Sequence, residues 1–190
     1  MMYRLGLMTY DIRNLEQIKG GCVVISNHPT LIDVVFLLGW IENASCILKS
    51  ALFRNPVTLG PATAAGYLNN DSTDLLSECL HSLENGFPLL VFPEGTRTRP
   101  GEKMSFRRGA ANIALAGGTE ILLVTITVDP VTLVKYQPWW AVPSRTPHYQ
   151  IEFQERWNAK SYLSDDRRSR QARNLTHDLE QYYLNILPVQ

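Results

Sequence analysis

Residues 22–33 read CVVISNHPTLID, and this stretch decides what kind of fold the chain can adopt. Residues 22–26 are apolar or small and rich in valine and isoleucine, which predicts a strand. Pro29 then favours the first turn of a helix, and it keeps His28 out of the helical conformation. A strand that is apolar on both faces is typical of a central sheet covered on both sides. The stretch therefore predicts a central strand that leads, through a polar junction, into a helix.

The same alternation continues along the chain. Apolar runs at residues 46–48, 88–92 and 121–128 predict further strands, and residues 149–153 alternate like a strand with one wet face. Helical spacing appears at residues 74–84, at residues 108–116 and from about residues 164–166 onward, while residues 34–41 are apolar all round, as in a buried helix or the lining of an acyl channel. This order predicts one α/β domain over residues 1–190, with a mixed, mostly parallel central sheet flanked by helices.

Composition narrows the class of protein. The chain has 190 residues, 45% of them hydrophobic, and 18 basic residues balance 18 acidic ones to a net charge of zero. Such a chain is neither disordered nor basic overall, so no nucleic-acid partner is expected. The longest uncharged stretch, residues 55–70, contains two prolines and two glycines and is a poor spanning helix, and the N-terminus fits a signal peptide poorly. Three widely spaced cysteines predict buried thiols in a reducing compartment.

The junction after the first strand carries a candidate catalytic pair. If His28 lies outside the helix, it can fold back toward Asp33, which would fix the imidazole tautomer and leave the other ring nitrogen as a base. A structural alternative is a capping box, with Thr30 as the N-cap and Asp33 returning a hydrogen bond. The motif alone leaves both interpretations open.

A second polar segment, residues 92–101 (FPEGTRTRPG), also directly follows a strand. Glu94 and Arg97 would lie at the edge where open α/β sheets bind ligands. Residues 97–108 contain five basic residues and one acidic residue, a local charge of +4 within a neutral chain. This patch suits phosphate or carboxylate groups, or an acidic carrier protein, although such a run can also be a solvated loop.

The segment at residues 129–147 is expected to be a long loop between two strands. Its paired tryptophans, Trp139 and Trp140, suit either a buried plug or contact with lipid. The remaining histidines lack metal-ligand spacing, so no metal site is expected.

Taken together, NHPTLID at residues 27–33 and FPEGTR at residues 92–97 resemble the glycerolipid (lysophospholipid) acyltransferase family. Residues 49–56 (KSALFRNP) with Gly60 resemble its K-x-x-L…P…G segment, and residues 106–110 (FRRGA) resemble the start of a helix in the family. The resemblance covers residues 21–128 and identifies the chain as a divergent, short, bacterial-type member.

The resemblance implies transfer of an acyl group from a carrier thioester to a hydroxyl of a lipid-type acceptor, within lipid metabolism such as phospholipid biosynthesis. His28 would be the general base, and Asp33 would orient it. The family pattern also implies nine substrate-binding residues: Asn27, Lys49, Asn70, Glu94, Gly95, Thr96, Arg97, Arg107 and Arg108.

Two departures from the family pattern bear on the acceptor. Asn70 stands where the family has an arginine that helps to bind the acceptor phosphate, and residues 123–125 lack the usual proline. The main expectation is therefore an acceptor without a phosphate monoester. The alternative is a 1-acylglycerol-3-phosphate acyltransferase in which Arg54 or another basic residue supplies the charge. A different class is a non-catalytic module that binds lipid or an acyl carrier.

The resemblance implies acyl carrier protein or coenzyme A as the thioester co-substrate and no separate cofactor. Because acceptor lipids reside in the bilayer, it also implies a cytoplasmic protein that is peripherally associated with the inner face of the membrane.

Overall fold

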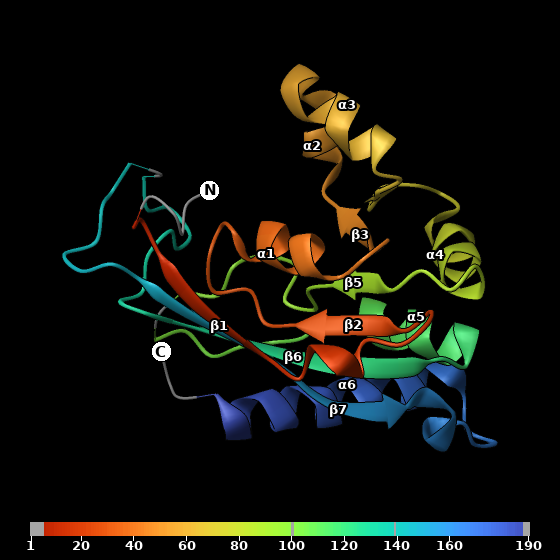
Figure 1. The fold of residues 1–190 in the computed structure, drawn as a ribbon. Helices are drawn as coiled ribbons and strands as arrows, with labels where there is room; N and C mark the ends of the chain where they lie inside the picture. Colours follow the sequence, from red (N-terminus) through yellow and green to blue (C-terminus); the bar gives the residue numbers. More distant parts are fainter. Residues whose placement is uncertain (1–5, 100, 139, 188–190) are drawn as a thin grey trace.

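The centre of the computed structural model, which describes residues 6–99, 101–138 and 140–187, is a seven-stranded sheet with the order β1-β7-β6-β2-β5-β3-β4 (Figure 1). The strands are β1 (Thr9–Arg13), β2 (Val23–Ser26), β3 (Ser45–Leu48), β4 (Leu68–Asn69), β5 (Leu89–Val91), β6 (Glu120–Asp129) and β7 (His148–Asn158). Five neighbours, from β6 to β4, run parallel, and β7 pairs antiparallel with β6. The predicted mixed, mostly parallel α/β sheet is confirmed.

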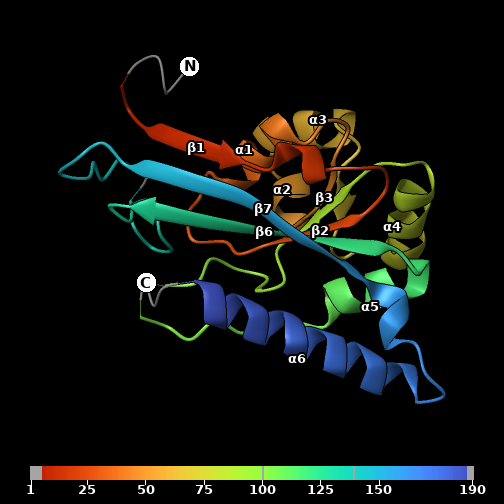
Figure 2. The same cartoon turned by 60° about the horizontal axis from the view of Figure 1, so that its bottom comes forward.

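Helices cover both faces of this sheet. They are α1 (Asp33–Trp40), α2 (Ser50–Arg54), α3 (Pro56–Ala64), α4 (Leu75–Glu84), α5 (Gly109–Gly117) and α6 (Arg168–Ile186), with 3₁₀ turns η1 (Leu15–Gln17) and η2 (Ala159–Tyr162). Side chains of α4, α5 and α6 share one hydrophobic cluster with the sheet, and α1 contributes to the cluster on the other face (Figures 1 and 2). In the described ranges, no helix has the length and apolar character needed to cross a membrane.

The central strands and helices lie close to the positions predicted from sequence, and the differences arise where pairing outweighs local pattern. The strand predicted at residues 149–153 extends to Asn158, because its second half pairs with the start of β6 across an irregularity between Leu122 and Val124. Helix α6 begins at Arg168 rather than near residues 164–166, because Arg167 is still extended, with ψ of 137°.

Helix α1 differs from the expectation of a helix buried all round. Leu37 is buried against the sheet, but Val35 is 71% exposed and Trp40 is 41% exposed. The prediction was wrong because, among the described residues, α1 packs on the sheet with one side only and its outer side meets solvent. The helix therefore presents an exposed apolar side.

The loop between β6 and β7 does not bury its described tryptophan. Trp140 is 67% exposed, which excludes the buried plug for this residue, and Trp139 lies outside the described residues. Lipid contact by this loop stays a prediction.

All three cysteines are free and fully buried, as expected. Burial raises the pKa of the Cys46 thiol to about 12 and that of Cys79 to about 11, and it also raises the pKa of Cys22. These thiols are therefore poor nucleophiles near neutral pH.

Tyr183 on α6 joins the helix to the centre of the sheet. Its fully buried hydroxyl donates to the Ile25 carbonyl oxygen at 2.6 Å and accepts from the Val124 amide at 3.1 Å. Tyr183→Phe should lower the free energy of unfolding by about 1–3 kcal/mol, because buried backbone groups lose their partner. Urea denaturation measures this loss, with the half-buried Tyr182→Phe as the control. Equal stability of the two variants would contradict the assignment.

Candidate active site

The predicted site residues follow the carboxyl ends of four adjacent parallel strands. His28 lies after β2, Glu94 after β5, Lys49 after β3 and Asn70 after β4. Parallel strands place their carboxyl ends at one edge of the sheet, which is where open α/β folds bind ligands. The fold therefore gathers these segments along a single edge.

The predicted contact between His28 and Asp33 is present. His28 Nδ1 lies 2.9 Å from Asp33 Oδ2, the Asp33 carboxylate is fully buried, and the His28 side chain is 16% exposed. Helix α1 begins at Asp33, so His28 lies outside the helix, as Pro29 predicts. Because a carboxylate only accepts hydrogen bonds, Nδ1 carries the proton and Nε2 is left as an acceptor.

Thr30 makes the two interpretations of this motif compatible. Its backbone N–H donates to Asp33 Oδ2 at 2.7 Å, and its hydroxyl donates to Asp33 Oδ1 at 2.5 Å. Thr30 is nevertheless not the N-cap residue, because that position belongs to Ile32. Asp33 thus accepts from the turn and from the imidazole together, which holds its carboxylate in one orientation.

Glu94 supports His28 from the neighbouring strand. Its Oε1 accepts from the His28 backbone N–H at 2.8 Å, and its Oε2 accepts from the Thr98 hydroxyl. Glu94 is 6% exposed, and this burial raises the pKa of its carboxyl. The hydrogen bonds from Thr98 and from the His28 backbone lower the pKa, but by less than burial raises it. Glu94 therefore holds the backbone of His28 in place, and its contact with the acceptor stays a prediction.

The raised pKa of Glu94 predicts a pH-dependent stability. The folded chain holds the Glu94 proton more tightly than the unfolded chain, so ionisation costs stability as pH rises from the ordinary carboxyl pKa, about 4.3, through the raised value. Across this window the parent should lose stability relative to Glu94→Gln. Urea denaturation over a pH series gives the difference, and a difference that does not change with pH would contradict the prediction.

Two of the predicted substrate-binding residues are engaged inside the protein. The Asn27 side chain is 2% exposed and pairs with Ile126 like a strand residue, donating to its carbonyl oxygen at 2.8 Å and accepting from its amide at 2.7 Å. Gly95 has a φ of +67°, and a Cβ there would lie 3.0 Å from Arg107 Nε. Glycine is therefore required at this turn, and Asn27 joins β2 to β6.

Arg97 ties the second motif to the loop after β6. Its Nη1 donates to the carbonyl oxygens of Leu133 at 2.9 Å and Val134 at 3.2 Å, and the Leu31 amide donates to the same Leu133 oxygen. The loop thereby touches both motif-bearing segments, residues 27–33 and 92–97. Among the described residues, the other N–H groups of Arg97 make no hydrogen bond, so an anionic ligand could accept from them.

The other predicted binding residues lie farther along the edge or at its rim. Asn70 Oδ1 accepts from the Ser50 amide, which brings Asn70 beside the exposed Lys49. Arg107 donates its backbone N–H to Pro93, and Arg108 is the exposed N-cap residue of α5. Within the described ranges, no hydrogen bond or ion pair connects these residues, or Thr96, to the His28 side chain.

Four residues of the site carry no role in the sequence-based prediction. Thr30 was considered only as a cap, and Thr98 lies one residue beyond the matched motif. Phe92 packs its ring on His28, with centroids 4.4 Å apart, and Leu133 lies about 100 residues away in a loop without a motif. Only the spacing of Thr30 from Asp33 offered a local signal.

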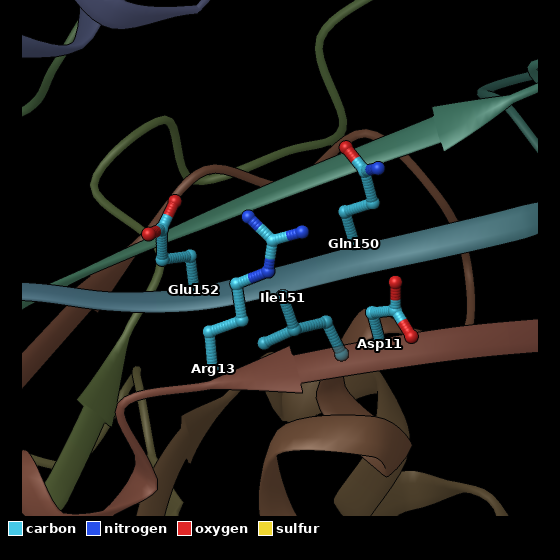
Figure 3. Close-up of a pocket in the computed structure, with 5 residues that line it drawn as sticks. All are labelled: Asp11, Arg13, Gln150, Ile151 and Glu152. Carbon is cyan, nitrogen blue, oxygen red and sulfur yellow. The ribbon is translucent and has the colours of Figure 1, made fainter.

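Two cavities elsewhere contain none of the predicted site residues. One, of about 30 Å³, lies between β1 and β7 and is lined by polar side chains around Ile151, which Figure 3 shows projecting from the two strands. This volume suits a single water molecule. The other, of about 370 Å³, lies between α4, α5 and Arg168. In the described chain, no group of three or more candidate ligands is placed to hold a metal ion.

Comparison with known proteins agrees with this geometry. The family model described as Acyltransferase matches residues 9–133, which is most of the chain and includes both motif-bearing segments. The chain belongs to the Acyltransferase family. The predicted resemblance over residues 21–128 is thus confirmed.

Individual members of the family share about 30% of their residues with this chain. The 1-acyl-sn-glycerol-3-phosphate acyltransferase of Helicobacter pylori is 30% identical over 73% of this chain and 63% of its own length. The chloroplastic enzyme BAT2 of Brassica napus is 29% identical over 61% of this chain. This chain spans only 36% of the length of BAT2.

A solved structure has the same fold. The crystal structure of the 1-acyl-sn-glycerophosphate acyltransferase PlsC from Thermotoga maritima matches 99% of this chain and 77% of its own, with a TM-score of 0.70 and 20% identity. The likeness confirms the fold.

Proposed function

We propose that this chain transfers an acyl group from a thioester to the free hydroxyl of 1-acylglycerol-3-phosphate, with His28 as the general base. The observation that carries the proposal is the 2.9 Å contact between His28 Nδ1 and the buried Asp33 carboxylate at the carboxyl edge of the sheet. Membership of the Acyltransferase family supports the reaction class.

The geometry suggests how the proton moves. His28 Nε2 takes the proton of the acceptor hydroxyl while that oxygen attacks the thioester carbonyl carbon. Asp33 stabilises the imidazolium that forms, and Thr30 keeps the carboxylate in place. When the tetrahedral intermediate collapses, the carbon–sulfur bond breaks and the proton passes from Nε2 to the departing thiol. Phe92 covers one face of the ring and limits the access of water.

The relatives favour the alternative acceptor over the main expectation from sequence. The two relatives described above are named 1-acyl-sn-glycerol-3-phosphate acyltransferases, whereas Asn70 and the missing proline at residues 123–125 suggested an acceptor without a phosphate monoester. Asn70 caps the first turn of α2, so it cannot replace a guanidinium. Arg97 follows Glu94 and contacts the loop after β6. It is therefore better placed than the exposed Arg54 to supply the positive charge that binds the acceptor phosphate.

The acceptor is tested by measuring kcat/KM on 1-oleoyl-glycerol-3-phosphate, 1-oleoyl-glycerol and lysophosphatidylethanolamine, each with acyl carrier protein and coenzyme A thioesters. We expect the phosphate monoester to be preferred by about 10- to 150-fold, the equivalent of one charge-assisted hydrogen bond of about 1.5–3 kcal/mol. Arg97→Leu should remove most of this preference.

Two outcomes would contradict this proposal. An equal or better kcat/KM on the acceptors without a phosphate monoester would restore the main expectation from sequence. Tight binding of acyl thioester or lipid without turnover of any acceptor would instead favour the non-catalytic module.

The donor and the cellular location are part of the same proposal. The exposed basic residues Arg107 and Arg108 beside the site suit either the phosphates of coenzyme A or an acidic carrier protein. A bilayer acceptor would place the protein at the inner face of the membrane, reached from the cytoplasm by peripheral association. Loss of vesicle flotation on changing Trp139 and Trp140 to alanine would support contact through the loop after β6.

A further inference from the structure

Helices α2 and α3 form a hairpin, residues 50–64, that projects from the carboxyl end of β3 away from the other helices (Figure 1). Ala62 is its only buried residue. Val57 is 80% exposed, Leu59 is 45% exposed and Leu52 is 39% exposed. Exposed apolar side chains concentrated on one projecting element indicate an interaction surface.

The polar groups at the junction of α2 and α3 are hydrogen-bonded within the hairpin. Asn55 Oδ1 accepts from the Val57 amide at 2.9 Å, and the Asn55 carbonyl oxygen accepts from the amides of Thr58 and Leu59. Pro56 has no N–H at the first position of α3, and the Thr58 hydroxyl donates to the Leu52 carbonyl oxygen at 2.5 Å. The start of α3 therefore needs no water, which is the condition for entering a lipid phase.

The charges around the hairpin have one sign. Between Glu42 and Asp71 the chain contains Lys49 and Arg54 and no acidic residue. Both basic residues are exposed, and they bracket α2 at its two ends. This arrangement suits anionic head groups, with apolar side chains below the level of the charges.

Helix α1 lies on the same side of the sheet as the hairpin (Figure 1). It exposes Val35 and Trp40, and the loop after β6 exposes Trp140 and Val142. The loop is joined to the start of α1 through the Leu31 amide, next to His28. The catalytic pair is thus bordered by apolar surface.

We infer that the α2–α3 hairpin is a membrane-docking element that inserts Val57, Leu59 and Leu52 among the lipids of an anionic bilayer. The inference deepens the proposed function, because it specifies how a lipid acceptor would be reached, but its main test needs no catalysis. The satisfied backbone and the one-signed charge favour lipid over a second copy of the chain, whose contact would juxtapose like charges.

The test is co-flotation of the whole chain with vesicles of phosphatidylcholine and phosphatidylglycerol. Val57→Asp/Leu59→Asp should lower the partition coefficient by about tenfold or more. The matched control Leu163→Asp/Ile186→Asp, with similarly exposed side chains on the other side of the molecule, should bind like the parent. Arg54→Gln should lower binding about fivefold on these vesicles and have little effect on pure phosphatidylcholine.

Insertion is measured directly with a fluorescent label. Because the native cysteines are fully buried, Val57→Cys can be labelled selectively with an environment-sensitive dye. Vesicles should shift its emission to shorter wavelength and leave the same dye at Leu163→Cys unchanged. This measurement does not depend on the stability of the aspartate variants.

Equal vesicle binding by Val57→Asp/Leu59→Asp and the parent, or no emission shift at Val57→Cys, would overturn the inference. The inference would also be overturned if the parent protein formed a dimer that did not bind vesicles and if Val57→Asp/Leu59→Asp dissociated that dimer. If His28→Ala abolishes acyl transfer while Val57→Asp/Leu59→Asp binds vesicles like the parent, the docking inference is wrong and the proposed function stands. If the hairpin binds vesicles but the protein acylates no acceptor, the proposed function is wrong and the docking inference stands.

Discussion

His28→Ala should lower kcat for acyl transfer by about 10²- to 10⁴-fold, the contribution expected of general-base assistance. The substitution removes the imidazole that Asp33 orients, and with it the Nε2 base, so the acceptor hydroxyl must lose its proton to water. Release of free thiol from an acyl thioester, followed with a chromogenic thiol reagent in the presence of acceptor, measures the rate.

Two controls separate chemistry from folding in this experiment. His177→Ala removes an exposed histidine of α6 and should keep the parent rate. The His28→Ala protein should stay folded but lose about 1–3 kcal/mol of stability, because the buried Asp33 carboxylate keeps Thr30 and loses the imidazole. Its urea midpoint should therefore show that it is folded under the assay conditions. A rate for His28→Ala equal to that of the parent would remove His28 from the mechanism.

Asp33→Asn should have an effect of similar size on kcat, about 10²- to 10⁴-fold, although the side chain keeps its shape. His28 Nδ1 and the Thr30 amide both contact Oδ2, so an amide nitrogen at that position would face two donors, and one at the Oδ1 position would face the Thr30 hydroxyl. In either orientation the imidazolium loses its counter-charge. Stability should also fall by about 1–3 kcal/mol, because a buried donor loses its acceptor.

Thr30→Val is the companion variant for Asp33→Asn. It removes one hydroxyl donor to Asp33 Oδ1 and leaves the carboxylate and its contact with His28 in place. We expect a loss of stability with a much smaller loss of kcat. If Asp33→Asn instead lost stability and kept the parent rate, Asp33 would serve the start of α1 and not the base.

Much of the site could be predicted from sequence because its parts are local. His28 and Asp33 are five residues apart, and the restriction that Pro29 places on His28 acts within the chain itself. The two motifs each follow a strongly apolar strand, and parallel strands present their carboxyl ends at one edge whatever lies elsewhere. The position of Glu94 at this edge was therefore predictable, although its hydrogen bond to the His28 amide was not.

Other features could not be predicted because they depend on segments far apart in the sequence. Strand β1 has no strong apolar pattern and exists because it pairs with β7, about 140 residues away. Arg97 resembles a ligand-binding arginine in sequence, yet one of its nitrogens is bonded to the carbonyl oxygens of a loop beyond β6. Asn27 belongs to a catalytic motif, but its amide completes the pairing of β2 with β6.

The sequence by itself determined the α/β class, the central strands and the contact between His28 and Asp33, because hydrophobic periodicity and proline restrictions act over a few residues. Only the tertiary structure decided which apolar residues face solvent, since burial depends on what packs from elsewhere in the chain. Residues 34–41 are apolar throughout and residues 50–64 are rich in apolar residues, yet Leu37 is buried against the sheet while Val35 and Val57 are exposed. The sequence thus identified which residues are apolar, and the packing of distant segments determined which of them are buried and which are exposed.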